Sequence, residues 1–155
     1  MLLTGGAGFI GSHLAERLAA EGYDVVVLDN LSTGRKENLS DALGTGRVRL
    51  VVGDVLEAAT VERLVAEVDA VFHLAAAVGV RLIVEQPVAT IVTNIIGTHN
   101  VLSAAAKKGV PVLLTSSSEV YGKARKLPLR ETDDLVLGPT ERLRWCYAAS
   151  KAVDE

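Results

Sequence analysis

The chain has 155 residues, of which 49% are hydrophobic and 23% are charged, and its formal net charge is -3. This length suffices for one globular domain with a hydrophobic core, and the slightly acidic charge gives no reason to expect nucleic acid as a partner. The single cysteine, Cys146, excludes an internal disulfide and suits a reducing compartment.

The sequence predicts a cytoplasmic protein that spans no membrane. The N-terminus has no basic region ahead of an apolar stretch, so no signal peptide is expected. No apolar run in the sequence approaches the roughly 18–20 residues that a membrane-spanning helix needs.

Five short apolar runs predict buried parallel strands, because they are continuous rather than alternating with polar residues. They are residues 1–4, 24–29, 48–53, 70–75 and 111–116. Between them, apolar side chains at helical spacing predict helices over 11–22, 57–68 and 87–108, the first stopped by Gly22 and the last opened by Pro87. This alternation predicts an α/β fold with an open parallel sheet in the order 3-2-1-4-5 and a ligand crevice between strands 1 and 4.

The pattern dissolves between Glu119 and Trp145, where glycines and prolines interrupt any periodicity. A long irregular segment in a compact domain is usually functional or disordered. We expect it to be mobile without substrate, because its few apolar residues offset little of its ordering entropy.

A glycine-rich turn follows the first predicted strand and opens the first predicted helix, in the sequence TGGAGFIGSHL. Gly5 allows the tight turn, Gly8 lets a pyrophosphate approach the backbone, and Gly11 lets the helix pack closely on the sheet. Asp29 ends the second strand, where a carboxylate accepts hydrogen bonds from an adenosine ribose and repels a 2′-phosphate. The pattern predicts a dinucleotide site that favours NAD over NADP.

A second acid, Asp54, follows the third predicted strand. Its carboxylate suits the adenine amino group and suits a cap of the next helix equally well, so both interpretations stay open.

Tyr147 and Lys151 are four residues apart and would share one face of a helix. A free tyrosine, with a pKa of about 10, is a poor base, but a nearby ammonium favours the phenolate. We therefore expect Lys151 to lower the pKa of Tyr147 and make it a catalytic base. Ser116, Ser117 and Ser118 lie at the carboxyl end of the fifth strand, where a hydroxyl would orient a substrate; local turns are the alternative.

Taken in order, the motifs TGGAGFIGSHL, DNLSTG, GDV, HLAA, TN, SSSEVYG and YAASK resemble the extended short-chain dehydrogenase/reductase family, in particular its NAD-dependent epimerases and dehydratases of nucleotide sugars. The segments HLAAAVGVRLIVEQPVATIVTN and LVLGPTERLRWCYAASKAVDE are most similar to UDP-glucuronate decarboxylases. The resemblance implies a Rossmann-type doubly wound sheet.

The resemblance also implies site residues. It assigns the catalytic hydroxyl to Ser117 and an active-site acid to Glu119, alongside Tyr147 and Lys151. Ser118 stands where the 4,6-dehydratases have Asp, which argues against dehydration. It implies no metal site, and NAD contacts from Gly5, Gly8, Phe9, Ile10, Gly11, Asp29, Asn30, Leu31, Ser32, Thr33, Gly34, Asp54, Val55, Leu74, Ala75, Ala76, Asn94, Tyr147 and Lys151.

The implied activity is decarboxylation of UDP-glucuronate, a lyase reaction. Oxidation at the sugar 4-position through Tyr147 and Lys151 makes a β-keto acid, which loses carbon dioxide readily because the ketone takes up the electron pair. A UDP-sugar 4-epimerase would share the first step and remains an alternative. A non-catalytic NAD-binding module is an alternative of another class.

Family members of this kind have a second half that holds the sugar nucleotide, and this chain matches only the first half. We therefore predict one NAD-binding domain over residues 1–155, truncated within the catalytic helix and weak or silent in turnover. The fifth strand would be an uncovered apolar edge, which predicts a homodimer or a larger assembly.

Overall fold

The computed structural model describes residues 1–124 and 126–155 of the chain. These residues form two compact units. Unit 1 comprises residues 1–75 and 97–115, and unit 2 comprises residues 76–96 and 116–155. Each unit is described below by itself.

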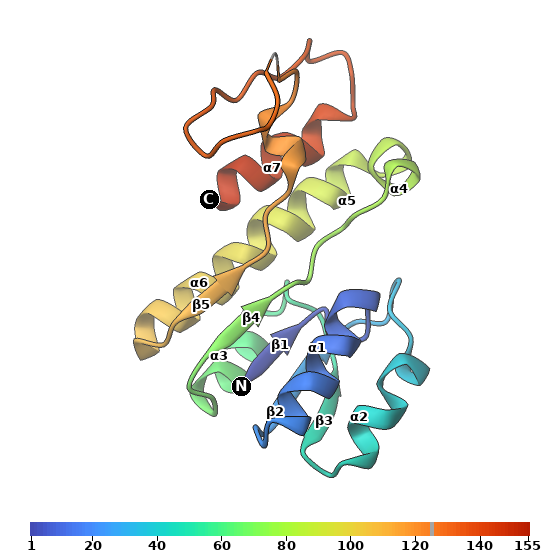
Figure 1. The fold of residues 1–155 in the computed structure, drawn as a ribbon, viewed down its shortest axis with the longest axis vertical. Helices are drawn as coiled ribbons and strands as arrows, with labels where there is room; N and C mark the ends of the chain where they lie inside the picture. The colour runs from blue at the N-terminus through green and yellow to red at the C-terminus, as the bar shows by residue number, and fades with distance from the viewer. Residues whose placement is uncertain (125) are drawn as a thin grey trace. The chain divides into compact units, whose positions relative to one another are not determined.

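Unit 1 is built on a five-stranded parallel sheet (Figure 1). The strand order is β3-β2-β1-β4-β5, which confirms the order predicted from the sequence. The order reverses between β1 and β4, where open sheets of this kind bind ligands at the carboxyl ends of the strands. The strands are β1 (Leu2–Thr4), β2 (Val25–Asp29), β3 (Val48–Val52), β4 (Val71–His73) and β5 (Val112–Leu114).

Both faces of the sheet are covered by helices, which explains why the strands are continuously apolar. On one face, Leu3, Val25 and Val27 pack in a cluster with residues of α1 (Phe9–Ala20) and α2 (Ser40–Gly44). On the other face, Leu2, Val26 and Leu28 pack with residues of α3 (Ala58–Ala66) and α6 (Gly97–Lys108).

Helix α1 ends where the sequence predicted. Gly22 has a positive φ of 90° and follows the C-cap residue Glu21. Its N–H bonds the Ala19 carbonyl, and the N–H of Tyr23 bonds the Leu18 carbonyl. This pair of bonds is the Schellman arrangement, which satisfies carbonyls that the helix itself leaves open.

The sequence analysis missed the short helices between β2 and β3. A 3-10 turn, η1 (Lys36–Leu39), leads directly into α2. Only Leu39 and Ala42 are buried in them, so the periodic signal is too brief to separate from a loop.

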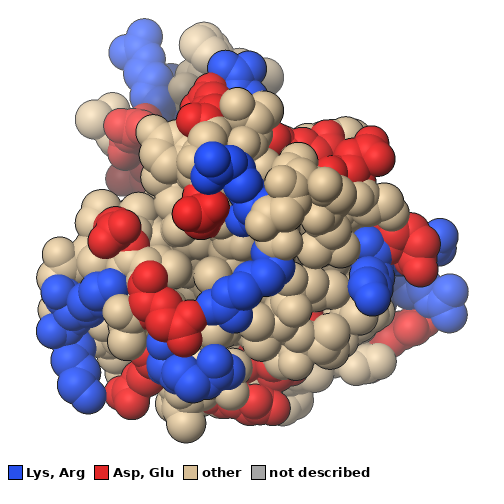
Figure 2. Space-filling view, turned by 90° about the horizontal axis from the view of Figure 1, so that it is seen from below, with Lys and Arg blue, Asp and Glu red and all other residues tan. Residues whose placement is uncertain are grey.

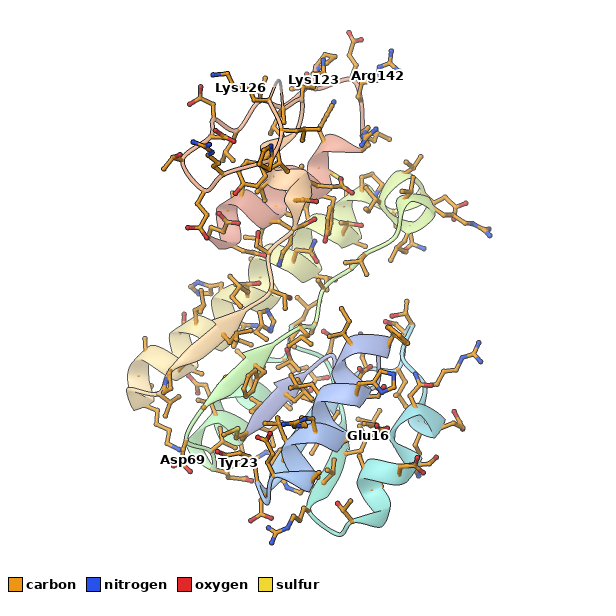
Figure 3. The ribbon with its side chains drawn as sticks, in the orientation of Figure 1. Glu16, Tyr23, Asp69, Lys123, Lys126 and Arg142 are labelled. Carbon is orange, nitrogen blue, oxygen red and sulfur yellow. The ribbon has the colours of Figure 1, made fainter. Side chains whose placement is uncertain are left out.

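Unit 2 contains α4 (Val80–Glu85), α5 (Pro87–Ile91), the 3-10 turn η3 (Ser118–Tyr121) and α7 (Trp145–Asp154). The predicted helix over 87–108 is present, with Pro87 at its start, but Val92–Ile96 forms a π-helical turn, η2, in its middle. The sequence also missed α4. In the described part of the segment between η3 and α7, Gly122 pairs with Val136 in an isolated bridge. Lys123, Lys126 and Arg142 belong to this segment and are exposed (Figure 3). Its mobility stays a prediction.

The helix from Pro87 to Lys108 has 22 residues and a mean hydropathy of 1.2, so by length and composition alone it could cross a membrane. A core helix of a soluble protein passes the same test, and this single helix is weak evidence for a membrane span. Within unit 1, its C-terminal part contributes Val101, Ala104 and Ala105 to the core.

Candidate cofactor and catalytic sites

The glycine-rich turn after β1 has no space for side chains at two positions. Gly5 has a φ of 71°, and a Cβ there would lie 2.7 Å from the backbone nitrogen of Ala75. A Cβ at Gly11 would overlap the carbonyl oxygen of Gly5. These contacts confirm a tight turn and a closely packed helix start within unit 1.

Gly8 differs from these two glycines. A Cβ at Gly8 would meet only the Gly5 carbonyl oxygen, at 3.3 Å. Gly8 is the N-cap of α1 and is extended, no side chain caps the helix, and its first turn has no acidic residue. The first N–H groups of α1 are therefore available to an anion.

Two large apolar side chains lie at the open end of this turn. Phe9 is 78% exposed and Ile10 is 68% exposed, although the helix that they begin has a buried face. Exposed apolar residues beside open N–H groups suit a ligand with both phosphates and apolar rings.

Asp29 joins the turn to the second strand. Its carboxylate accepts hydrogen bonds from the backbone N–H of Ala7 at 2.9 Å and of Leu31 at 2.8 Å. Leu31 has a positive φ of 58°, so this bond stabilises a sparsely populated backbone conformation. Each carboxylate oxygen has a second lone pair, so Asp29 retains capacity for the ribose contact that the sequence predicts.

Asp54 does not cap α3, so that interpretation was wrong. The N-cap of α3 is Glu57, whereas Asp54 accepts hydrogen bonds from the N–H of Leu56 at 2.9 Å and from the Asn30 amide at 2.8 Å. These bonds form a local turn and tie it to the loop after β2. The adenine contact of Asp54 stays a prediction.

The other residues of unit 1 that are predicted to contact NAD lie either in the loop after β2 or in the core. The loop after β2 is largely exposed and is held by local contacts: Ser32 donates its backbone N–H to the Asn30 side chain, and a Cβ at Gly34 would lie 3.0 Å from an Asp29 oxygen. Val55 is 6% exposed, and its side chain packs against Gly97, so this side chain serves the core. The residues in these two places that are predicted to contact NAD are Asn30, Leu31, Ser32, Thr33, Gly34 and Val55.

Leu74 and Ala75 lie at the carboxyl end of β4, against β1. The N–H of Leu74 bonds the Thr4 carbonyl, and the N–H of Ala75 bonds the Thr4 hydroxyl at 3.2 Å. They therefore lie at the carboxyl ends of β1 and β4, where the strand order reverses. The close-packed turn, the open helix N-terminus and the acid after β2 together fit a dinucleotide.

The four predicted catalytic residues all lie in unit 2. The Ser117 hydroxyl hydrogen bonds with the Tyr147 phenol, and it accepts the Glu119 N–H at 3.2 Å. The neighbouring Ser116 instead contacts the Glu155 carboxylate. Of the serines that follow β5, Ser117 is therefore the one that the structure brings to Tyr147.

The electrostatics of Tyr147 differ from the sequence prediction. Burial raises the pKa of Tyr147, and the Glu119 and Asp154 carboxylates raise it further, while the hydrogen bond with Ser117 lowers it. The Lys151 ammonium is paired with Asp154 at 2.9 Å, and the net change in the pKa of Tyr147 is upward. The prediction of a lowered Tyr147 pKa was wrong for this arrangement.

Asn94 lies on the π-helical turn and is 1% exposed. Its oxygen accepts the N–H of Ala77 at 2.7 Å, and its amide donates to the Ser150 hydroxyl at 3.0 Å. Ser150 in turn donates to the Tyr147 carbonyl. Asn94 thus connects the segment that begins at Ala76 to the catalytic helix, and the contacts of Asn94 and Ala76 with NAD stay predictions. Such turns often occur at functional sites.

A cavity of about 110 Å³ in unit 2 is lined by Val80, Ile83, Glu119 and Arg144. The Arg144 guanidinium lies 5.0 Å from the centre of the Trp145 ring, a cation–π distance. No ion pair within the described residues involves Arg144. The sequence analysis missed Arg144, although its position three residues before Tyr147 was a usable signal.

Charges outside these sites are mixed. On the face drawn in Figure 2, basic and acidic side chains are interspersed, which leaves no large region of one sign there. Among residues 1–124 and 126–155, no group of three His, Cys, Asp or Glu side chains is placed to hold a metal ion.

Comparison with known proteins relates these sites to a family. The family model described as the NAD dependent epimerase/dehydratase family matches residues 1–155. A UDP-N-acetyl-alpha-D-glucosaminuronate decarboxylase from Bacillus cytotoxicus is 42% identical over 99% of this chain and 47% of its own length. A UDP-glucuronic acid decarboxylase from Arabidopsis thaliana is 42% identical over 100% of this chain and 34% of its own length.

A solved structure gives the same relationship. A UDP-N-acetylglucosamine 4-epimerase from Methanobrevibacter ruminantium, in complex with UDP-N-acetylmuramic acid, is 33% identical with a TM-score of 0.88. The match covers 99% of this chain and 47% of the epimerase. The chain therefore spans less than half the length of these relatives. With its glycine-rich turn, its strand order and its Ser117–Tyr147 contact, the chain belongs to the NAD dependent epimerase/dehydratase family.

Proposed function

We propose that this chain supplies the NAD-binding and catalytic residues of an enzyme that modifies a UDP-sugar, with decarboxylation of UDP-glucuronate as its activity. The observation that carries this proposal is the hydrogen bond between Ser117 and Tyr147, in the unit whose cavity is lined by Glu119 and Arg144. The decarboxylases among its relatives support it, although the chain spans only part of their length.

Bound NAD would accept a hydride from the sugar carbon that carries the 4-hydroxyl. Tyr147 takes the proton of that hydroxyl, and Ser117 orients the oxygen by hydrogen bonding. The resulting ketone is two carbons from the carboxylate carbon, so the bond to carbon dioxide breaks and its electron pair passes to the ketone. Protonation of the remaining enolate at carbon, followed by return of the hydride and of the Tyr147 proton to the ketone, would give the UDP-pentose and restore NAD. This role requires the Tyr147 phenolate, which burial and the Glu119 carboxylate disfavour because they raise the pKa of Tyr147. A cation near the phenol is therefore part of the proposal.

Arg144 favours an acidic sugar. Its guanidinium has no carboxylate partner among the described residues and lines the same cavity as Glu119. Arginine binds carboxylates with two parallel hydrogen bonds, and such a bond would hold a uronate against repulsion by Glu119. The other cavity residues, Val80 and Ile83, are apolar and would accept an uncharged hydroxymethyl group. That observation keeps a UDP-sugar 4-epimerase as the second candidate.

A single-turnover assay distinguishes the candidates. The chain is placed in excess over UDP-glucuronate with NAD present, so that even slow conversion is seen, and the sugar nucleotides are separated by chromatography and analysed by mass spectrometry. Decarboxylation yields a UDP-pentose lighter by one carbon dioxide, and epimerisation yields an isomer of equal mass that elutes separately. NAD binding with no conversion in this assay supports a binding module, whereas weak steady-state turnover does not.

Two arginine variants test the preference for a uronate by nucleotide binding. Arg144→Gln should reduce binding of UDP-glucuronate and leave UDP-glucose binding nearly unchanged, because only the uronate carries the carboxylate. Arg142→Gln removes an equal charge from the exposed segment seen in Figure 3 and serves as the matched control. Equal losses for both nucleotides in the Arg144 variant would contradict the uronate preference.

A further inference from the structure

We propose that Asp154 is a positioning residue that competes with Tyr147 for the ammonium of Lys151. The inference rests on the proposed roles of Tyr147 and Lys151, and nothing in the sequence motifs assigns a role to Asp154. Its consequence is that the availability of Lys151 to Tyr147 is controlled by a third residue on the same helix.

The Lys151–Asp154 pair is more deeply buried than the other ion pairs of the described residues. The two residues are three apart on α7, and the Lys151 Nζ lies 2.9 Å from an Asp154 oxygen. The side chains are 3% and 1% exposed, whereas every other ion pair found among the described residues has both side chains at least 37% exposed. A buried pair resists separation because splitting it leaves an uncompensated charge in the interior.

Lys151 has unused hydrogen-bonding capacity. An ammonium carries three donors, and Asp154 is the one acceptor of Lys151 within the described part of the chain. The phenolate of Tyr147 or a ligand hydroxyl would use the remaining donors. Asp154 weakens the attraction between the Lys151 ammonium and these acceptors, because its own negative charge already balances the ammonium.

The charged groups around Tyr147 lie on α7 and on the elements packed against it. Helix α7 packs against α5, η2 and η3. Neither α5 nor η2 contains a titratable side chain, whereas η3 contributes Glu119 and Tyr121. Glu119 and Asp154 thus oppose the Lys151 ammonium, and both carboxylates raise the pKa of Tyr147 in addition to burial, while Arg144 at the N-cap of α7 lines a cavity with Glu119. If Asp154 were neutral, Lys151 would balance Glu119 and favour the phenolate.

The test is a pH titration of Tyr147 in the chain without NAD or nucleotide. Tyrosines are labelled with 13C at Cζ and followed by NMR, and Tyr147→Phe assigns the resonance. Asp154→Asn should move the Tyr147 midpoint to lower pH, and the conservative variant Asp154→Glu should restore it. Glu155→Gln removes the same charge from the exposed next residue of the chain and should leave the midpoint in place. An unchanged or raised midpoint in Asp154→Asn overturns the proposal.

A double variant covers the case in which Asp154→Asn fails to fold. Lys151→Met combined with Asp154→Asn removes both charges, and neutral replacements of buried pairs are often well tolerated. The proposal predicts a midpoint near that of the parent, because the pair contributes little net charge. A clearly raised midpoint would mean that Lys151 acts on Tyr147 regardless of Asp154, and would also overturn the proposal. This readout needs no turnover, so its failure is separate from a failure of the decarboxylase assignment.

Discussion

Ala7 donates its backbone N–H to the carboxylate of Asp29, which fixes the glycine-rich turn after β1 to the end of β2. The same carboxylate accepts the N–H of Leu31 and so also shapes the loop that follows. Asp29 therefore acts on the proposed cofactor site in two ways, as a structural anchor and as a prospective ribose acceptor.

Asp29→Ala should weaken NAD binding and reduce the preference for NAD over NADP. Loss of a hydrogen bond from a charged acceptor costs about 1.5–3 kcal/mol, and repulsion of the 2′-phosphate disappears with the carboxylate. Asp29→Asn keeps an acceptor without the charge and should lose mainly the preference. Calorimetric titration with both dinucleotides measures these effects, and an unchanged preference in both variants would show that Asp29 faces away from the ribose.

Gly8→Val should abolish NAD binding, because its side chain would obstruct a pyrophosphate. A Cβ at Gly8 would lie 3.3 Å from the Gly5 carbonyl oxygen, a contact that is relieved only if the turn shifts by a few tenths of an ångström, so Tm is measured together with binding. Gly44→Ala, at a position with no atom within 4 Å of the added Cβ, is the control and should keep both binding and Tm. If Gly8→Val binds NAD as the parent does, the turn does not hold the phosphates.

Tyr147→Phe should lower any turnover of a UDP-sugar by about 10²–10⁴-fold, the usual contribution of a general base. Because burial and the Glu119 carboxylate raise the pKa of Tyr147, the fraction of phenolate and hence the rate should increase with pH across the neutral range. Glu119→Gln removes one of these causes and should move the rise to lower pH. Tyr121→Phe changes a phenol of η3 that has no proposed role, and its profile should match that of the parent.

The steady-state turnover of the chain by itself is expected to be undetectable or far below that of a full-length relative, because the chain spans less than half the length of those relatives. Rapid turnover that disappears in Tyr147→Phe would contradict this expectation and support the catalytic assignment at the same time.

Self-association is expected through the edge of the sheet in unit 1. β5 pairs only with β4, and Leu113 on it is 53% exposed. Leu113→Lys should shift the chain toward monomer in light scattering, because a charge on an edge strand opposes strand pairing. Leu127→Lys places the same charge on a residue that is 85% exposed in the irregular segment, and it should leave the assembly intact. A stable monomer of the parent chain would refute the prediction.

The parts of this fold that could be predicted depend on local pattern. Continuous apolar runs gave the strands and their order, and Gly22 gave the end of α1, because burial and chain reversal act over a few residues. The π-helical turn at Val92–Ile96 could not be predicted, since it is a shift in hydrogen-bond partners that leaves the apolar spacing nearly unchanged. The direction of the Tyr147 pKa also escaped prediction, because it depends on burial and on Glu119 from a distant part of the chain.

Trp145 is the one tryptophan of the chain, and its ring lies beneath the Arg144 guanidinium at the start of the catalytic helix. The chain thus contains a single tryptophan, which can be excited selectively over its three tyrosines, beside Arg144 of the cavity proposed for the uronate. A ligand that draws Arg144 from the ring changes the polarity around the indole, so its emission would report occupancy of that cavity with no background from other tryptophans. The position of this one side chain makes the acidic-sugar hypothesis open to direct optical titration, without labels and without turnover.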